Sequence, residues 1–225
     1  DLLLHDIGNV LNIIKTSLKL REMEEKNSTN MKEKREVIDI IKQQVKRGSM
    51  LLSNVRSLSK IEEGNLPIEP VNLRKTIEKS VDFVKSLHHK IHVEIKPETT
   101  KDIIIVEAGD LLIEAFENIV LNGVIHNESN QVRLVISYSV LEREEKSFVR
   151  IEFKDNGIGI PPNRKKLIFK RKYGKGQKST GMGIGLSLVK RIIKEYGGEI
   201  WVENRINDDY TQGSNFIVLL RKTFQ

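Results

Sequence analysis

Residues 155–161 read Asp-Asn-Gly-Ile-Gly-Ile-Pro, and they decide how the second half of the chain is interpreted. The preceding residues alternate, with Val149, Ile151 and Phe153 on the buried side of a predicted strand, and Asp155 continues that side. A buried carboxylate needs hydrogen-bond donors, of which an adenine amino group is one, and glycines let the backbone approach such a ring. Taken alone, an ordinary Asp-Asn-Gly turn that closes a strand explains the stretch slightly better.

A second polar pattern lies upstream, on a helix predicted from Asp110, as its N-cap, to about Asn127. Glu114, Asn118 and Asn122 are spaced by four residues and share one face of this helix. An ordinary solvated face fits this spacing equally well, although asparagine is a mediocre helix former and such faces more readily use Lys, Glu or Gln. Amide oxygens suit Mg²⁺, which takes much of its ligand shell from water and phosphate.

A basic and glycine-rich segment lies downstream of the same stretch. Gly181, Gly183 and Gly185 open a helix predicted over about 183–196, and the N–H groups at a helix N-terminus can receive phosphate. The spacing matches neither the dinucleotide fingerprint nor a Walker loop, so this signal is weak on its own. The positive cluster just before it indicates a nucleotide phosphate as partner, and it consists of Lys165, Lys166, Lys170, Arg171, Lys172, Lys175 and Lys178.

The first 65 residues carry two apolar stripes at helical spacing. One runs from Leu2 to about Arg21 and the other from Val37 to Leu58, with a helix stop at Gly64. The polar stretch between them predicts an antiparallel helical hairpin. Two helices cannot enclose both stripes, so we expect a homodimeric four-helix bundle.

His5 lies on the first predicted helix, away from the apolar stripe, so we expect it to face solvent. Most isolated exposed histidines have no special role. A neutral imidazole is nevertheless a competent nucleophile at neutral pH, and an exposed phosphoryl acceptor can be reached by two successive partners. Asp6 is its neighbour, and Asn9 lies one turn further along the same face.

The two parts of the chain differ in character, and we predict an α+β protein. Residues 1–65 form the helical hairpin, and residues 66–225 form an α/β sandwich in which helices cover one face of a mixed sheet. In the second domain we expect helices over about 73–87, 110–127 and 183–196, and strands over about 91–95, 103–107, 132–141, 148–154, 199–204 and 215–220.

The composition narrows the classes of function. With 38% hydrophobic and 31% charged residues in 225, the chain is typical of a soluble globular protein, and it contains no apolar run long enough to span a bilayer. The absence of cysteine excludes disulfides and thiolate sites. The net charge of +7 permits nucleic-acid binding, but most positive residues are scattered over amphipathic helices.

The order of these motifs resembles that of sensor histidine kinases, whose ATP-binding domain of the Bergerat type is shared with gyrases, chaperones and mismatch-repair proteins. The likeness covers nearly the whole chain: a His-Asp helix, an Asn-x-x-x-Asn helix, an Asp-x-Gly-x-Gly loop, a basic lid and a Gly-x-Gly-x-Gly helix entry. Residues 59–64 followed by 70–73 also resemble that family's junction between the dimerisation helices and the ATP-binding domain.

The resemblance implies ATP-dependent phosphorylation of His5, followed by transfer to an aspartate of a response regulator. Asp6 would orient or deprotonate the His5 ring, and Asn9 matches the position that places a water in relatives with phosphatase activity. ATP and Mg²⁺ are the implied cofactors. The implied partners are a response regulator receiver domain and a second copy of the chain, bound through the N-terminal helices.

In the ATP-binding domain, the resemblance makes Asn122 the Mg²⁺ ligand, with Asn118 as its helper, and makes Asp155 the reader of the adenine amino group. Phe169 would anchor the lid. The other residues that the resemblance places around ATP are His126, Gly157, Gly159, Ile160, Lys172, Tyr173, Gly181, Gly183, Gly185 and Leu186.

Three departures from the family pattern stand out. Gly8 and Val10 replace a common Arg and Pro near the acceptor. Ile125 replaces a lysine that commonly follows the second asparagine, which removes a cation near the nucleotide, and the basic lid is placed to compensate. Lys172 replaces a frequent aromatic residue of the lid. We still expect activity, because none of these positions is the acceptor, the metal ligand or the adenine aspartate.

Other functions stay open at this stage. An ATPase related to gyrase would need an acidic residue where Asn118 stands. A degenerate ATP-binding dimeric scaffold and a nucleic-acid-binding protein are further alternatives. We expect no nucleic acid partner, no membrane contact from this segment and a cytoplasmic location, with a longer parent that is soluble or anchored at the inner face of the cell membrane.

Overall fold

The computed structural model describes residues 11–18, 31–64, 66–88, 91–97, 103–143, 145–170 and 185–223. The chain divides into two compact units, Asp1–Ser59 and Lys60–Gln225. Among the described helices, none combines the length and the apolar character needed to cross a membrane.

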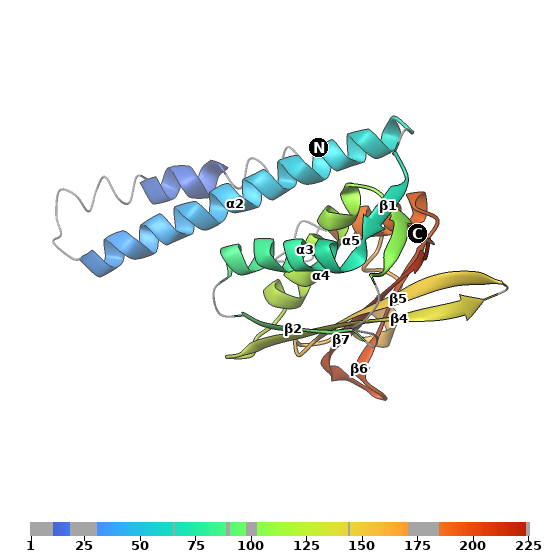
Figure 1. Cartoon of the computed structure of the whole chain (residues 1–225). Helices are drawn as coiled ribbons and strands as arrows, with labels where there is room; N and C mark the ends of the chain where they lie inside the picture. The colour runs from blue at the N-terminus through green and yellow to red at the C-terminus, as the bar shows by residue number, and fades with distance from the viewer. Residues whose placement is uncertain are drawn as a thin grey trace. The chain divides into compact units, whose positions relative to one another are not determined.

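The first unit consists of helices. Residues 11–18 are helical, and α2 spans Met31–Glu62, so that its last turn belongs to the second unit. Figure 1 shows the two helices running antiparallel, as the two apolar stripes predict. Large apolar side chains at seven-residue spacing stay exposed on both helices: Leu11, Leu18, Val45 and Leu52.

The second unit alternates strands and helices along the chain. Its helices are α3 (Leu73–Leu87), α4 (Leu111–Ile125) and α5 (Gly185–Glu195), with a 3-10 turn, η1, at Pro162–Arg164. Its strands are β1 (Glu69–Asn72), β2 (Ile91–Pro97), β3 (Ile105–Ala108), β4 (Val132–Arg143), β5 (Lys146–Asp155), β6 (Glu199–Ile206) and β7 (Asp209–Arg221).

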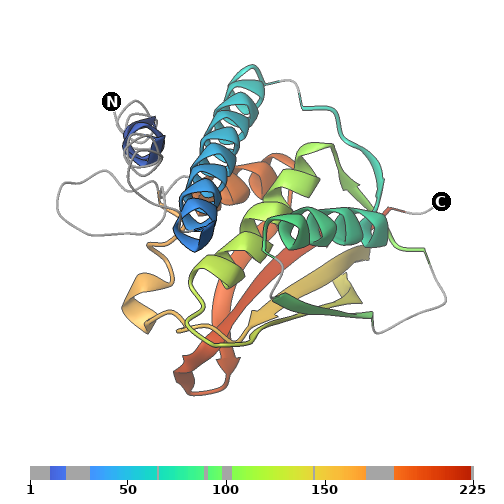
Figure 2. The same ribbon diagram turned by 90° about the vertical axis from the view of Figure 1, so that its left-hand side faces the viewer.

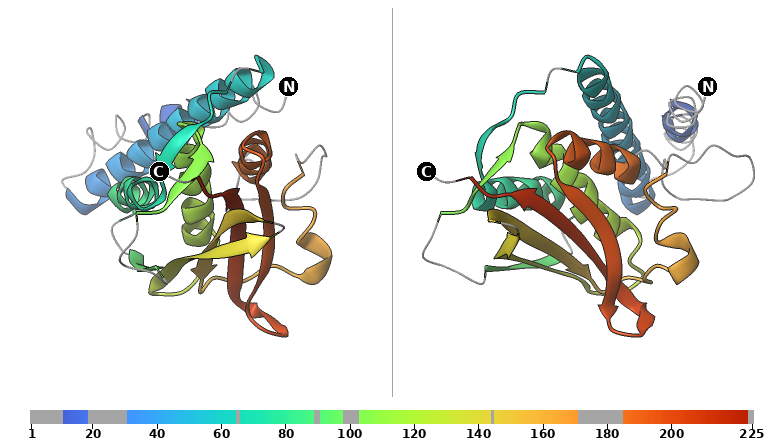
Figure 3. Two further views of the ribbon diagram at one scale, coloured as in Figure 1. Left: turned by 45° about the vertical axis from the view of Figure 1, so that its right-hand side comes forward. Right: turned by 90° about the vertical axis from the view of Figure 1, so that its right-hand side faces the viewer.

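Five of these strands form one mixed sheet in the order β2-β4-β5-β7-β6. The β2–β4 pair is parallel and the other pairs are antiparallel. Helices α3, α4 and α5 lie over one face of this sheet, as Figures 2 and 3 show. The α+β architecture with a mixed sheet is therefore confirmed. Strands β1 and β3 form a separate antiparallel pair, which is linked to the main sheet by a bridge between Val106 and Lys222.

Helix α4 packs in the middle of the core, and its C-terminal end lies beside Asp155. Phe116 meets Phe153 of β5 with ring centroids 5.2 Å apart. Within the last turn of the helix, a Cβ on Gly123 would lie only 3.1 Å from Leu134 and 3.3 Å from Asp155. Glycine at this position lets α4 approach the sheet beside the Asp155 carboxyl.

Helix α4 begins directly after Asp110, which is its N-cap residue as predicted, but without the expected side-chain bond. The prediction that the Asp110 side chain caps this helix is wrong, because Asp110 has helical backbone angles and its side chain makes no capping hydrogen bond. The N–H of Leu111 is hydrogen-bonded by Tyr196, which follows α5. Gly109 permits this contact, since a Cβ there would lie 2.8 Å from the Tyr196 hydroxyl. The N–H groups of Leu112 and Ile113, which a side-chain cap would bind, donate instead to the carbonyls of Gly109 at 2.9 Å and Asp110 at 3.3 Å.

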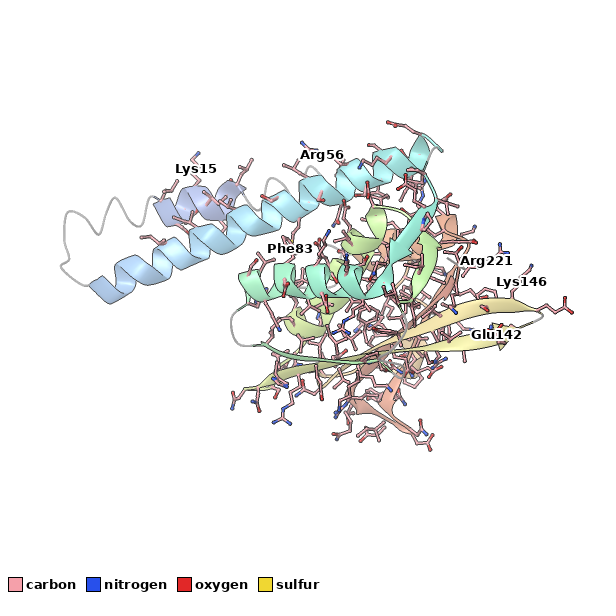
Figure 4. The ribbon with its side chains drawn as sticks, in the orientation of Figure 1. Lys15, Arg56, Phe83, Glu142, Lys146 and Arg221 are labelled. Carbon is pink, nitrogen blue, oxygen red and sulfur yellow. The ribbon has the colours of Figure 1, made fainter. Side chains whose placement is uncertain are left out.

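The hairpin of β4 and β5 extends away from the end of β5 that carries Asp155. Figure 4 shows Glu142 and Lys146 near its tip. Ser147 Oγ donates a 2.6 Å hydrogen bond to Glu142 within this hairpin. The burial of β5 alternates along its whole length, which places Asp155 on the helix-covered side as its strand periodicity predicts.

Candidate nucleotide-binding site

A cavity of about 140 Å³ opens where the end of α4 meets the end of β5 and the middle of β7. It combines apolar walls with a small number of polar groups, which is the usual composition of a small-molecule site. Its lining residues are Asn122, His126, Asp155, Ile158, Gly159, Ile160, Pro161, Arg164, Ile168, Leu186, Ser214 and Phe216.

Asp155 is the buried charged group of this cavity, with 6% of its surface exposed. Its Oδ1 accepts hydrogen bonds from the N–H of Gly157 at 2.8 Å and of Ser214 at 3.3 Å. Burial raises the pKa of the Asp155 carboxyl. The two N–H groups and the charge of Arg205 act in the opposite direction without cancelling that effect. Both of these hydrogen bonds end on Oδ1. Among the described residues no donor is bonded to Oδ2, which can therefore accept a hydrogen bond from a ligand.

Two glycines let backbone segments meet tightly around Asp155. Gly159 has φ +67°, and a Cβ there would lie 1.6 Å from the carbonyl oxygen of Tyr210. Gly213 has φ +110°, and a Cβ there would lie 2.0 Å from the carbonyl oxygen of Asp155. Both the left-handed backbone and the lack of space require glycine. The loop after β5 and residues 210–213 of β7 therefore lie in close backbone contact.

The two asparagines of α4 are oriented by the backbone of their own helix. Asn118 Nδ2 donates to the carbonyl of Glu114 at 2.8 Å, and Asn122 Nδ2 donates to the carbonyl of Asn118 at 2.6 Å. Asn122 lines the cavity. Asn118 is buried against the start of α5, where a Cβ on Gly185 would lie 2.7 Å from its Oδ1. With its nitrogen engaged, the Asn122 amide presents an oxygen, which suits a hard cation such as Mg²⁺.

Sequence comparison identifies the domain that contains this cavity. The family described as histidine kinase-, DNA gyrase B- and HSP90-like ATPase matches residues 107–223, just over half of the chain. The chain belongs to this ATPase family. The matched residues include every described residue that lines the cavity.

Individual proteins of this ATPase family resemble a larger part of the chain. The signal transduction histidine-protein kinase/phosphatase MprB of Mycolicibacterium paratuberculosis is 24% identical over 222 residues, which cover 96% of this chain and 41% of MprB. The solved catalytic domain of histidine kinase ThkA is 27% identical with a TM-score of 0.56, over 70% of this chain and 97% of that domain. This chain thus spans about two fifths of the length of its curated relative.

A third likeness extends over both units. The crystal structure of ThkA in complex with the response regulator protein TrrA matches 97% of this chain and 59% of the ThkA chain, with a TM-score of 0.64 and 24% identity. At this identity the match establishes a shared fold. It agrees with a helical unit followed by an ATPase-type α+β unit.

Residues 165–169, which follow the motif at 155–161, pack against the sheet. Phe169 is buried and meets Phe216 of β7 edge to face, with centroids 6.3 Å apart. Lys190 Nζ of α5 lies 6.0 Å from the centroid of the Phe169 ring. Lys165 Nζ donates to Asn204 Oδ1 of β6 at 2.6 Å. Phe169 therefore attaches the described residues 161–170 to the sheet.

The structure brings together several residues that the sequence singled out. Asn122, His126, Asp155, Gly159, Ile160 and Leu186 line the cavity, and Gly157, Asn118 and Gly185 lie directly beside it through the contacts given above. The remaining predicted site residues lie outside the described part of the chain; they are His5, Asp6, Asn9, Lys172, Tyr173, Gly181 and Gly183.

Sequence reasoning did not assign six residues of the cavity wall, of which Ile158 and Pro161 lie within the glycine motif at 155–161. Ser214 supplies an N–H to Asp155, Phe216 and Ile168 supply apolar surface, and Arg164 supplies a positive charge. The turn signal Gln-Gly-Ser before the last buried strand was a possible indication for Ser214. Local sequence contains no comparable signal for Phe216, because a tertiary contact brings it to the cavity.

Proposed function

We propose that this chain is the catalytic core of a sensor histidine kinase, which phosphorylates His5 with ATP and passes the phosphoryl group to an aspartate of a response regulator. One observation carries most of the proposal: a buried Asp155 with one oxygen already satisfied lies in the same cavity as the oriented amide of Asn122, within a domain of the ATPase family. The names of MprB and ThkA as histidine kinases support the same activity.

The cavity has features suited to an adenine nucleotide. Oδ2 of Asp155 would accept the exocyclic amino group, and the apolar walls would exclude water from the ring. Asn122 would hold Mg²⁺ through its Oδ1, with Asn118 supporting it from the preceding turn. When bound, Mg²⁺ would supply charge neutralisation on the phosphate oxygens.

The proposed chemistry involves two displacements at one phosphorus atom. A ring nitrogen of His5 attacks the γ-phosphorus in line, an N–P bond forms, and the bond to the bridging oxygen breaks as ADP leaves. Asp6 takes the proton from the other ring nitrogen. A carboxylate oxygen of the regulator then attacks the same phosphorus, the N–P bond breaks, and the proton returns to the imidazole. Asn9 would place a water for hydrolysis of the phospho-aspartate, which adds a phosphatase activity.

The proposed assembly is a homodimer formed by the N-terminal helices, with the functional boundary between residues 65 and 66. The exposed apolar residues at seven-residue spacing on both helices of the first unit support a partner of the same kind. Light scattering should give twice the chain mass of 25.8 kDa. Leu52→Glu should lower this to one chain mass, whereas an unchanged mass in that variant would contradict the proposed interface.

Incubation with γ-labelled ATP tests the kinase proposal directly. We expect acid-labile, alkali-stable label on the wild type, none on His5→Ala, and transfer of the label to a receiver domain. Wild type that releases free phosphate and stays unlabelled would instead indicate an ATPase. Wild type that binds ATP without either reaction would indicate a signalling scaffold.

Titration with a fluorescent ATP analogue tests the nucleotide site separately from the chemistry. We expect binding that strengthens with Mg²⁺ and falls at least tenfold in Asp155→Ala, because a buried hydrogen bond to a ligand is lost. Asn122→Ala should lose the Mg²⁺ dependence. Binding that is insensitive to both substitutions would sink the assignment of this cavity.

A further inference from the structure

One positive charge in the cavity wall has no role in the site described so far. Among the described residues that line the cavity, Arg164 carries the permanent positive charge and Asp155 the carboxylate. Ile125, which stands where relatives commonly carry a lysine, is 46% exposed and lies outside the described lining. The cation at this wall therefore comes from the segment that follows the motif at residues 155–161.

The backbone fixes the position of Arg164. Its N–H donates to the carbonyl of Pro161 at 2.9 Å, and its own carbonyl accepts from the N–H groups of Leu167 at 2.9 Å and Ile168 at 3.0 Å. Prolines at positions 161 and 162 restrict the turn further. Phe169, packed on Phe216, anchors the end of the same segment. Hydrogen bonds thus hold the backbone at Arg164, whose exposed side chain lies at the wall of the cavity.

No carboxylate of the described residues forms an ion pair with Arg164. In the part of the chain that the structure describes, the Arg164 side chain makes no ion pair or side-chain hydrogen bond, whereas neighbouring Lys165 is engaged by Asn204. The cation that acts on the Asp155 carboxyl is Arg205. Arg164 is therefore a cation of the cavity wall that no described carboxylate neutralises.

We propose that Arg164 is a further nucleotide-binding residue, whose guanidinium pairs with phosphate oxygens of the bound nucleotide. This inference rests on the proposed function, because it assumes that the cavity holds a nucleotide. A guanidinium offers two parallel N–H groups to a phosphate and stays charged at every physiological pH. Arg164 supplies a fixed positive charge in a cavity that Ile125 does not line.

The test compares Arg164→Gln with wild type for three ligands that share the adenine ring: ATP, ADP and adenosine. Isothermal titration in the presence of Mg²⁺ should show ATP and ADP weakened about tenfold, since a charge-assisted contact is lost, and adenosine unchanged. Arg164→Lys should recover part of the loss, because a lysine keeps the charge without the planar fork. Arg143→Gln, in the exposed tip of the β4–β5 hairpin, is the matched control and should bind all three ligands as wild type does.

Two outcomes would overturn the assignment. Unchanged ATP binding in Arg164→Gln would show that the guanidinium does not meet the phosphates. An equal loss for adenosine would show that Arg164 shapes the wall for the ring instead, provided that circular dichroism and thermal unfolding match wild type. Failure of the proposed function looks different, because wild type itself would then bind none of the three ligands, and the role of Arg164 would fall with it.

Discussion

Asn127 Nδ2 donates a 2.8 Å hydrogen bond to Asn156 Oδ1, which ties the residues after α4 to the residue that follows Asp155. The same Oδ1 accepts the N–H of Arg133 at 2.8 Å, and Asn156 Nδ2 donates to the carbonyl of Gln131 at 3.0 Å. One side chain thereby joins the end of α4, the start of β4 and the loop after β5. These are the elements that carry Asn122 and Asp155.

Replacement of Asn156 should loosen the nucleotide cavity. Asn156→Ala removes three hydrogen bonds and should lower the free energy of unfolding by about 2 kcal/mol. It should also weaken ATP binding, because the loop that carries Gly157 and Gly159 keeps only its backbone bond from Ile158 to His126 at the end of α4. Asn156→Asp keeps both acceptor contacts and loses the donor, so its losses should be intermediate. Urea unfolding and titration with ATP measure both effects, and equal values for the two variants would contradict this role.

Two glycines with the same backbone angle allow strain and clash to be separated. Gly159 has φ +67° and a Cβ there would lie 1.6 Å from the Tyr210 carbonyl oxygen, whereas Gly197 has φ +66° and nothing within 4 Å. Gly197→Ala should cost about 1 kcal/mol from the left-handed angle alone. Gly159→Ala should cost about 3 kcal/mol or more and abolish ATP binding. Similar unfolding midpoints for both variants would mean that the backbone at Gly159 relaxes.

The sequence predicts the fold well where one element contains its own signal. Helix α3 has the predicted bounds, because its apolar spacing is regular and Asn72 provides a local cap that accepts the N–H of Lys75 at 3.0 Å. Strand β1 was not predicted, since four residues without alternation carry no period. The capping bond of the Asp110 side chain was predicted wrongly, because the N–H groups of Leu112 and Ile113 donate to backbone carbonyls, and the Leu111 N–H is bound by the distant Tyr196. Local reasoning cannot find such a replacement.

The same distinction applies to the site. The burial of Asp155 follows from strand alternation, and the shared face of Asn118 and Asn122 follows from helical spacing. The hydrogen bond between Asp155 and Ser214 joins positions 59 residues apart, and nothing in either segment predicts it alone. Arg164 was missed because it precedes the positive cluster that begins at Lys165, and its local sequence does not show that it lines the cavity. Site residues that are not marked by helical or strand periodicity can be identified only from the folded structure.

Glu152 should stabilise the second unit at neutral pH on the sheet face opposite the helices. Burial tends to raise its pKa, but hydrogen bonds from Lys154, Asn215 and Arg150 outweigh that effect and hold the pKa at about 2. A carboxyl whose folded pKa lies below its unfolded value adds stability above the unfolded pKa of about 4.5, and this stability is lost as the pH falls toward 2.

Glu152→Gln should therefore lower the free energy of unfolding by about 1 kcal/mol at pH 7. The difference from wild type should shrink steadily between pH 4.5 and pH 2. Exposed Glu199 on β6 provides the control, and Glu199→Gln should stay within about 0.5 kcal/mol of wild type. Urea unfolding across this range measures the difference. A gap that stays constant down to pH 2 would show that the Glu152 charge is not what stabilises the sheet.

Glu117 on α4 should have the opposite effect on stability. Burial raises its pKa to about 7, and the nearby charge of Glu114 adds to the shift. A carboxyl whose folded pKa lies above its unfolded value costs stability as the pH rises, and here the cost develops between pH 4.5 and pH 7. The ionisation of Glu117 should therefore lower the free energy of unfolding of the wild type as the pH rises through this interval.

Glu117→Gln removes the ionisation while keeping the shape of the side chain. The variant should match wild type near pH 4 and be more stable by about 1 kcal/mol at pH 8, because a half-buried charge no longer forms. Glu114→Gln should recover a smaller part of this gain, since it removes only the like charge. Exposed Glu128, just after α4, is the matched control and should give no pH-dependent gain. A Glu117→Gln gain equal at pH 4 and pH 8 would assign the effect to packing and rule out the titration.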